Sequence, residues 1–148
     1  MITIQGVMKA GSRGDYGLRA LVYLASVKGD NRPIQIHTIA ERQQIPEDYL
    51  RQLLVQLRLA GLVRSVRGPH GGYLLAREPE AISMGEVLDV LEGSGDPMPC
   101  RHLDADEPRC NVLAGCNIRH LWREASGQMQ EVLHRTTLAE LAAEGPVR

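Results

Sequence analysis

Residues 46–76, PEDYLRQLLVQLRLAGLVRSVRGPHGGYLLA, contain the change of periodicity that decides the fold. The first half predicts a helix, because four leucines recur at three- and four-residue steps and form one apolar stripe: Leu50, Leu53, Leu54 and Leu57. Gly61 ends this pattern. The segments LVRSV and YLLA then predict two short strands, with RGPHGG as the turn between them. The stretch therefore predicts a helix followed by a β-hairpin.

The residues upstream predict two more helices. GDYGLRALVYLASVKG places its apolar residues largely on one face, which indicates a helix over about 14–28, and Gly29 marks its end. A shorter helix is expected over about 36–43, joined by a tight turn to the helix that begins near Pro46. Two helices, a tight turn and a hairpin are the element order of a winged helix-turn-helix, here within residues 1–80. The predicted fold is mainly α with a small β-hairpin.

Residues 81–148 predict a second region. Ser83 can cap a helix that runs to about Leu91, with Glu86 placed for a capping box. A long amphipathic helix is expected over about 113–136, followed by a short helix in LAELAAE. The apolar stripe of the long helix consists of Ile118, Leu121, Trp122, Ala125, Met129, Val132 and Leu133. This stripe either packs on its own domain or pairs across a homodimer, and the a/d-like spacing favours a C-terminal dimerisation helix.

Composition and charge narrow the class of protein. The net charge is −1, but residues 1–80 hold 11 Lys and Arg against 7 Asp and Glu, whereas residues 81–148 hold 6 against 11. This asymmetry favours contact between the first half and a polyanion. No apolar run is long enough to cross a membrane and no signal-peptide pattern is present, so we expect a cytoplasmic protein. No nucleophile–base pair or phosphate loop indicates an enzyme.

Polar residues on the third predicted helix and on the hairpin suit DNA. The helix offers Asp48, Arg51, Gln52 and Gln56 on its polar face, and Arg and Gln match the guanine and adenine edges. The hairpin offers Arg64, Arg67 and His70 for phosphate or minor-groove contact. Glycines at 68, 71 and 72 keep its tip free of side chains. Double-stranded DNA is the expected partner, and a protein-binding adaptor is the alternative.

All three cysteines lie close together in the sequence. Cys100 and Cys110 fall in a predicted loop of about 93–113, and Cys116 follows it closely. Nine residues separate the first two and five separate the last two, so no Cys-x-x-Cys pair indicates a zinc knuckle or a thioredoxin-like site. Three thiolates in a segment rich in Pro and Gly suit an iron–sulfur cluster. Zinc with a histidine, and a cluster-free thiol switch, remain alternatives.

The segments GDYGLRAL, YLRQLLVQLRLAGLVRSVRGPHGGYLLA and MGEVLDVLEG resemble the IscR/NsrR/CymR (Rrf2) family of winged-helix transcription regulators. The resemblance runs from about Met8 to Leu141. It implies a homodimeric regulator, such as a repressor, that binds a palindromic operator. It aligns Tyr49, Arg51 and Gln52 with recognition-helix positions, and Arg67 with a wing arginine that enters the minor groove.

Resemblance to the cluster-binding branch of this family implies that the three cysteines hold an iron–sulfur cluster, for which a four-iron type is favoured and a two-iron type stays open. In a nitric-oxide-sensing member an Asp near the start of the first helix of the other subunit is a ligand, and Asp15 lies at that position. His120 is the alternative fourth ligand, and His102 or solvent stay open. The predicted function is therefore a regulator whose DNA affinity is controlled by a cluster that senses redox state, nitric oxide or iron.

Overall fold

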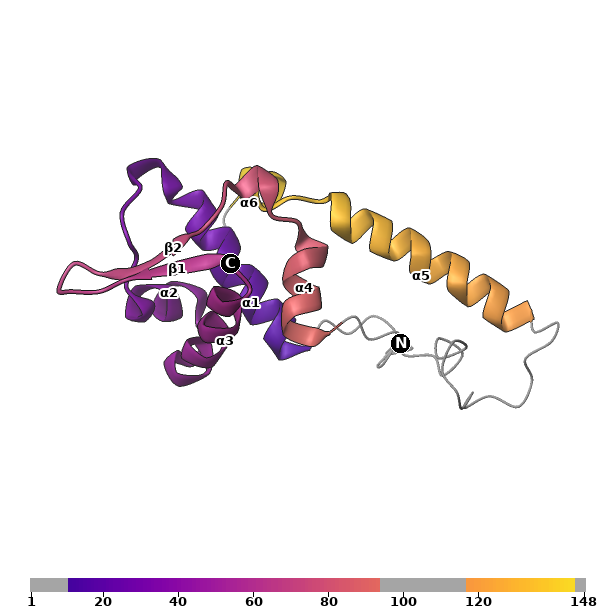
Figure 1. The fold of residues 1–148 in the computed structure, drawn as a ribbon, viewed down its shortest axis with the longest axis horizontal. Coiled ribbons are helices and arrows are strands. Elements are labelled where there is room, and N and C mark those ends of the chain that lie inside the picture. Colours follow the sequence, from indigo (N-terminus) through magenta and orange to yellow (C-terminus); the bar gives the residue numbers. More distant parts are fainter. Residues whose placement is uncertain (1–10, 94–116, 146–148) are drawn as a thin grey trace.

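The computed structural model describes residues 11–93 and 117–145, without the side chains of residues 117–119 and 122. The helices and strands are α1 (Ser12–Ser26), α2 (Ile36–Gln43), α3 (Glu47–Leu59), β1 (Val63–Val66), β2 (Gly72–Leu75), α4 (Met84–Glu92), α5 (Asn117–Arg135) and α6 (Leu138–Ala143), with 3-10 turns η1 (Lys28–Asp30) and η2 (Pro79–Ala81). They confirm the predicted fold class (Figure 1). The three cysteines lie outside the described residues, as does the expected start of the long helix at residue 113.

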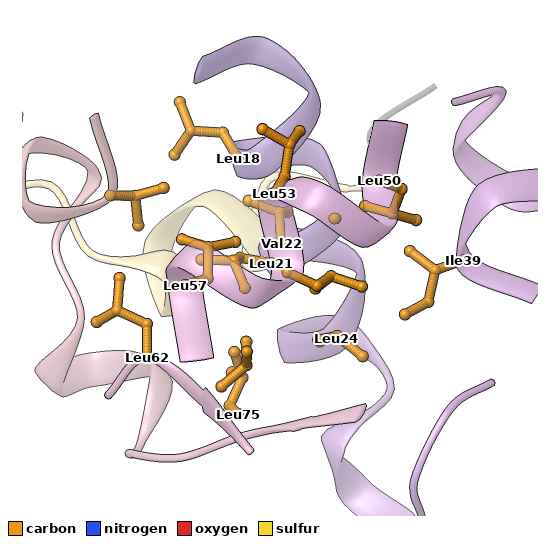
Figure 2. Packing of buried hydrophobic residues seen from close by; sticks show 14 of the residues in the cluster. Leu18, Leu21, Val22, Leu24, Ile39, Leu50, Leu53, Leu57, Leu62 and Leu75 are labelled. Atoms are coloured by element: carbon orange, nitrogen blue, oxygen red, sulfur yellow. The ribbon is translucent and has the colours of Figure 1, made fainter. Parts of the chain in front are cut away.

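The core is aliphatic and centres on α1. Leu21, Leu53 and Leu57 are fully buried there, as the leucine stripe of α3 predicts. Figure 2 shows side chains from α1, α2, α3 and the hairpin meeting in this core. Each fully buried leucine contributes about 1.5–3 kcal/mol of transfer free energy. This burial fixes α2 and α3 as a helix-turn-helix on the outer side of α1.

The hairpin is a small wing with a third strand segment at its base. β1 and β2 pair antiparallel, with Val63 opposite Leu75 and Val66 opposite Gly72. Ile34 exchanges two backbone hydrogen bonds with Tyr73, of 3.0 and 2.8 Å. The φ of Gly72 is +154°, and a Cβ there would overlap the carbonyl oxygen of Ile34. The close pairing at the base of the wing therefore requires glycine.

α4 and α6 complete the same core. Val87, Leu91 and Leu138 are buried in one cluster with the leucines of α1 and α3. Residues 82–84 run beside residues 136–138, held by Met84 N–H to the Thr136 carbonyl (2.8 Å) and Leu138 N–H to the Ile82 carbonyl (2.9 Å). We call this pairing the seam.

Helix capping at the seam differs in part from the expected pattern. Ser83 caps α4 by accepting from the Glu86 N–H at 3.1 Å, as predicted. The prediction of a full capping box at Ser83 is wrong. The Glu86 carboxylate accepts a hydrogen bond from Arg77 and not from the Ser83 backbone N–H. A full capping box occurs at α6, where Thr137 and Glu140 bond each other's backbone N–H groups.

α5 extends away from this core as an arm (Figure 1). Among the described elements its main neighbour is α4. Leu121 and Val132 are 64% and 46% exposed, so much of the predicted apolar stripe is unburied within this chain. No helix in the described ranges is both long and apolar enough to cross a membrane.

Candidate nucleic-acid interface

The outer face of α3, the predicted recognition helix, carries several exposed side chains. Four of its leucines, Leu50, Leu53, Leu54 and Leu57, point into the core, which leaves Asp48, Arg51, Gln52 and Val55 exposed on the other side. Three of these four were predicted to face DNA. Val55, 41% exposed, was not, although a methyl-bearing side chain on this face suits contact with a thymine methyl group.

Arg51 is held by an acidic neighbour. Its Nη2 lies 3.0 Å from the Glu47 carboxylate one turn earlier, and the other oxygen of Glu47 lies 3.2 Å from Nδ1 of His37 on α2. All three side chains are substantially exposed. The group links the start of α2 to the start of α3 and orients the Arg51 guanidinium. No helical pattern within α2 singles out His37, because its partner Glu47 lies on the next helix.

Tyr49 is placed differently from its neighbours on α3. It is half-buried, with its ring edge-on to Tyr16 of α1 at a centroid distance of 5.7 Å. Its hydroxyl oxygen lies 3.4 Å from Ser12 Oγ. Tyr49 therefore packs α3 against α1 and presents its hydroxyl near the start of α1.

Gln56 also faces α1 rather than the outer side of α3. Its Oε1 accepts a 2.6 Å hydrogen bond from Nη2 of Arg13, and the Arg13 Nε donates to the Leu91 carbonyl at 3.0 Å. Gln56 is half-buried as a result. Of the predicted base-contacting set, the exposed face brings together Asp48, Arg51 and Gln52, and Gln56 lies on another side of the helix.

The predicted wing residues are all exposed: Arg64, Arg67 and His70. Gly71 does more than leave space at the tip of the wing. A Cβ at this position would overlap the Val66 carbonyl, so the tight hairpin turn requires glycine there. His70 also lines a shallow cleft of about 440 Å³ at the base of the wing, together with Arg32, Pro33, Gln35 and Gly71. The wing thus presents cationic groups on a short, tightly closed hairpin.

Two of the predicted metal ligands lie in described residues. Asp15 is in the first turn of α1, its side chain 55% exposed, with Arg19 Nε 3.8 Å away. His120 is exposed in the first turn of α5. Within residues 11–93 and 117–145, no group of three His, Cys, Asp or Glu side chains could hold a metal. The predicted site therefore depends on the segment that contains Cys100, Cys110 and Cys116.

Comparison with known proteins identifies the family. Residues 10–144 match the Rrf2 family model, described as an iron-dependent transcriptional regulator. The regulator CymR of Bacillus subtilis is 40% identical over 136 residues, which cover 92% of this chain and 91% of that protein. IscR of Vibrio parahaemolyticus is 36% identical over 140 residues, covering 95% of this chain and 80% of that protein.

Solved structures agree with these relatives. The structure of B. subtilis CymR, described as the global cysteine regulator, superposes with a TM-score of 0.77 at 37% identity and covers 93% of this chain and 98% of that chain. The oxidized form of Staphylococcus aureus CymR gives a TM-score of 0.71 at 36% identity, covering 91% and 96%. Family, fold and exposed recognition face agree, and the chain belongs to the Rrf2 family of DNA-binding transcription regulators, which are not enzymes.

Proposed function

We propose that the chain is a homodimeric, cytoplasmic regulator that binds a palindromic operator and whose DNA affinity is controlled by an iron–sulfur cluster. The observation that carries the DNA-binding part is the outer face of α3, where Asp48, Arg51 and Gln52 are exposed together next to an exposed cationic wing. Residues 1–80 supply these contacts. Residues 81–148 supply the cysteine segment and the dimerisation helix.

The division of labour on DNA follows from side-chain chemistry. Arg51 and Gln52 have the donors and acceptors that base edges in the major groove require. Arg67 and Arg64, on the wing, suit phosphates and the narrow minor groove, which attract guanidinium groups without reading much sequence. α3 therefore supplies specificity, and the wing supplies affinity that depends on salt.

The cluster is supported by donor chemistry and by the iron-dependent description of the family. Three thiols within a span of 17 residues suit soft iron ligation, and the exposed Asp15 carboxylate is available as a fourth, oxygen ligand. His120 is the alternative. When bound, a cluster supplies iron that responds to oxidant, nitric oxide or iron supply. Asp15, at the start of α1, would then connect that state to the winged helix.

The homodimer is supported by α5. Leu121 and Val132 are exposed on α5, which contacts α4 near its own C-terminal end. The apolar stripe of α5 is therefore available to a second copy of the chain. Two winged helices related by a two-fold axis match a palindromic operator.

An anaerobic preparation tests the proposal. Protein purified without oxygen is expected to be coloured and to contain iron and sulfide in stoichiometric amounts. Its binding to DNA from its own upstream region is expected to change when iron is chelated. Colourless protein containing zinc, or no metal, would contradict the cluster. A chain that binds no DNA in either form, but captures a protein partner, would support an adaptor instead.

A cluster-free thiol switch is the second candidate. It is favoured by the relation to S. aureus CymR, whose structure is described in an oxidized form. Three closely spaced cysteines can form one disulfide under oxidation and leave one thiol. In that case metal-free protein would change its DNA affinity on treatment with peroxide and recover it with a dithiol reductant.

A further inference from the structure

The start of α1 and the end of α4 meet at close range (Figure 1). Gly11, Gly14 and Gly17 lie at three-residue steps along α1 and face the last turn of α4. A Cβ at Gly17 would overlap Leu91, and a Cβ at Gly14 would lie 2.8 Å from Leu88 Cδ2. Because α1 presents no side chain at these three positions, the two helix ends are near enough to share hydrogen bonds.

Each helix end satisfies a polar group of the other. The Gly14 N–H, one of the first N–H groups of α1, donates to the Glu92 carboxylate at 2.6 Å. In return the Nε of Arg13 donates to the Leu91 carbonyl, one of the last of α4, at 3.0 Å. Terminal N–H and C=O groups have no partner within their own helix. Side chains therefore cap both ends reciprocally.

The charges in this arrangement suit the neighbouring helix and not their own. A cation in the first turn of α1 and an anion in the last turn of α4 each oppose the dipole of the helix that carries them. Arg13 instead approaches the negative end of α4, and Glu92 approaches the positive end of α1. Local helix stability does not explain these two residues, whereas the contact between the helices does.

Arg13 also extends the contact to the recognition helix. Its Nη2 donates to Gln56 on α3 at 2.6 Å, so one guanidinium bonds α3 and the end of α4 at the same time. Both bonds are partly buried, which protects them from competition with water. Leu91 is nine residues before Cys100.

We propose that Arg13 is a positioning residue that couples the end of α4 to the orientation of the recognition helix. Gln56 acts on DNA through Arg13 and not by contact with a base. This inference rests on the proposed function, because the coupling matters only if α3 reads DNA. It adds two residues, Arg13 and Glu92, whose substitution should change regulation more than binding.

The bridge itself is tested without DNA. Hydrogen–deuterium exchange is measured on α3 amides in the full chain, its Glu92→Ala variant, and both again with Arg13→Met. Glu92→Ala is expected to speed exchange in the second half of α3 at least threefold, and to have little further effect once Arg13 is Met. Thermal denaturation checks that each variant is folded, and Arg13→Lys, which cannot span both acceptors, serves as a second variant. Equal exchange in α3 for all folded variants would overturn the bridge.

The regulatory role is tested with DNA. The readout is the ratio of operator affinities between the cysteine-intact chain and a chain with all three cysteines changed to Ser. Arg13→Met and Gln56→Met are each expected to reduce this ratio at least threefold, and the double variant no further. Gln52→Ala, the matched control on the exposed face, should weaken both forms by the same factor and leave the ratio unchanged.

The two failures are distinguishable. If Gln56→Met behaves as Gln52→Ala does, Gln56 is a base contact and the inference is wrong while DNA binding stands. If no form binds the operator, the proposed function is wrong, and the exchange experiment still decides whether Arg13 connects α3 to α4.

Discussion

His134 on α5 and Asp89 on α4 join the arm to the core, with His134 Nε2 3.0 Å from Asp89 Oδ2. The other ring nitrogen, Nδ1, lies 2.9 Å from the Gln130 carbonyl oxygen. Both nitrogens therefore face acceptors, an arrangement that only the doubly protonated ring satisfies in full. The carbonyl of Gln130, and next the carboxylate of Asp89 with the charge of Glu86 nearby, raise the pKa of His134 above its ordinary value of 6.5.

A pH-dependent contribution to stability follows from this raised pKa. A pKa that is higher in the folded than in the unfolded chain stabilises the fold fully below about pH 6.5, and the benefit is lost as pH rises through the folded value. Because the His134 and Asp89 side chains are 45% and 40% exposed, solvent screens their interaction and we expect a contribution of less than about 1 kcal/mol. Urea unfolding at about pH 5.5 and about pH 8.5 measures it. His134→Gln should reduce the difference between the two pH values, and an unchanged difference would assign it to other groups.

Gly72→Ala is expected to destabilise the wing. The side chain would overlap the Ile34 carbonyl at a backbone φ of +154°, so we expect a loss of about 2 kcal/mol or more in the free energy of unfolding. Gly29→Ala is the matched control, because a Cβ at Gly29 meets nothing within 4 Å. Chemical denaturation measures both variants, and equal midpoints would contradict the role given to the wing base.

Arg67→Ala is expected to weaken operator binding about tenfold and to lower the slope of log affinity against log salt by about 1, because one phosphate or minor-groove contact is lost. Arg135→Ala removes another exposed cation, at the end of α5, and should leave both quantities unchanged. Fluorescence anisotropy across a salt series provides the measurement. An Arg67 variant with wild-type slope would place the wing away from DNA.

Leu121→Arg is expected to disrupt the homodimer without unfolding the monomer. Its side chain is 64% exposed in the single chain, so an arginine costs little there, whereas a dimer interface would bury the charge. Sedimentation velocity should show a shift toward monomer of at least tenfold in dissociation constant. Glu124→Arg, on the same exposed helix, serves as the control. A dimer that survives Leu121→Arg would exclude this part of α5 from the interface.

Asp15→Ala is expected to leave iron bound through the three cysteines but to weaken the link between cluster state and DNA affinity. A carboxylate is a hard donor to iron, so its loss changes the attachment to α1 more than cluster retention. Iron content and operator affinity, with and without chelation, are measured on the same preparation. Asp15→Ala with unchanged coupling would leave His120, or another ligand, in that role.

The fold could be predicted from the sequence because the leucine spacing of α3 and the switch to a hairpin are local patterns with few alternatives. Leu50, Leu53 and Leu57 are buried as that spacing requires. The exposed face of α3 followed from the same pattern for Asp48, Arg51 and Gln52.

Residues at the edge of the stripe could not be placed in this way. Tyr49 and Gln56 lie beside the leucines on the helix, and their direction is decided by Tyr16 and Arg13 on α1, which are more than 30 residues away in the chain. The capping box at Ser83 failed for the same kind of reason, because Arg77 competes for Glu86. Side chains with a choice of partners are settled by tertiary contacts that no local pattern contains.

The seam lies at one end of α5, so a small tilt there produces a large displacement at the other end of the helix. Residues 82–84 lead into α4 and residues 136–138 lead from α5 into α6, so the seam, together with the His134–Asp89 pair, joins the base of the arm to the core. α5 has 19 residues and is about 28 Å long at 1.5 Å per residue. A tilt of about 10° at the seam therefore displaces its far end, where His120 lies, by roughly 5 Å. In a dimer joined through α5, the distance between the two recognition helices would depend on the tilt of α5 at the seam. The preferred spacing of the two operator half-sites would then depend on the seam as well as on α3.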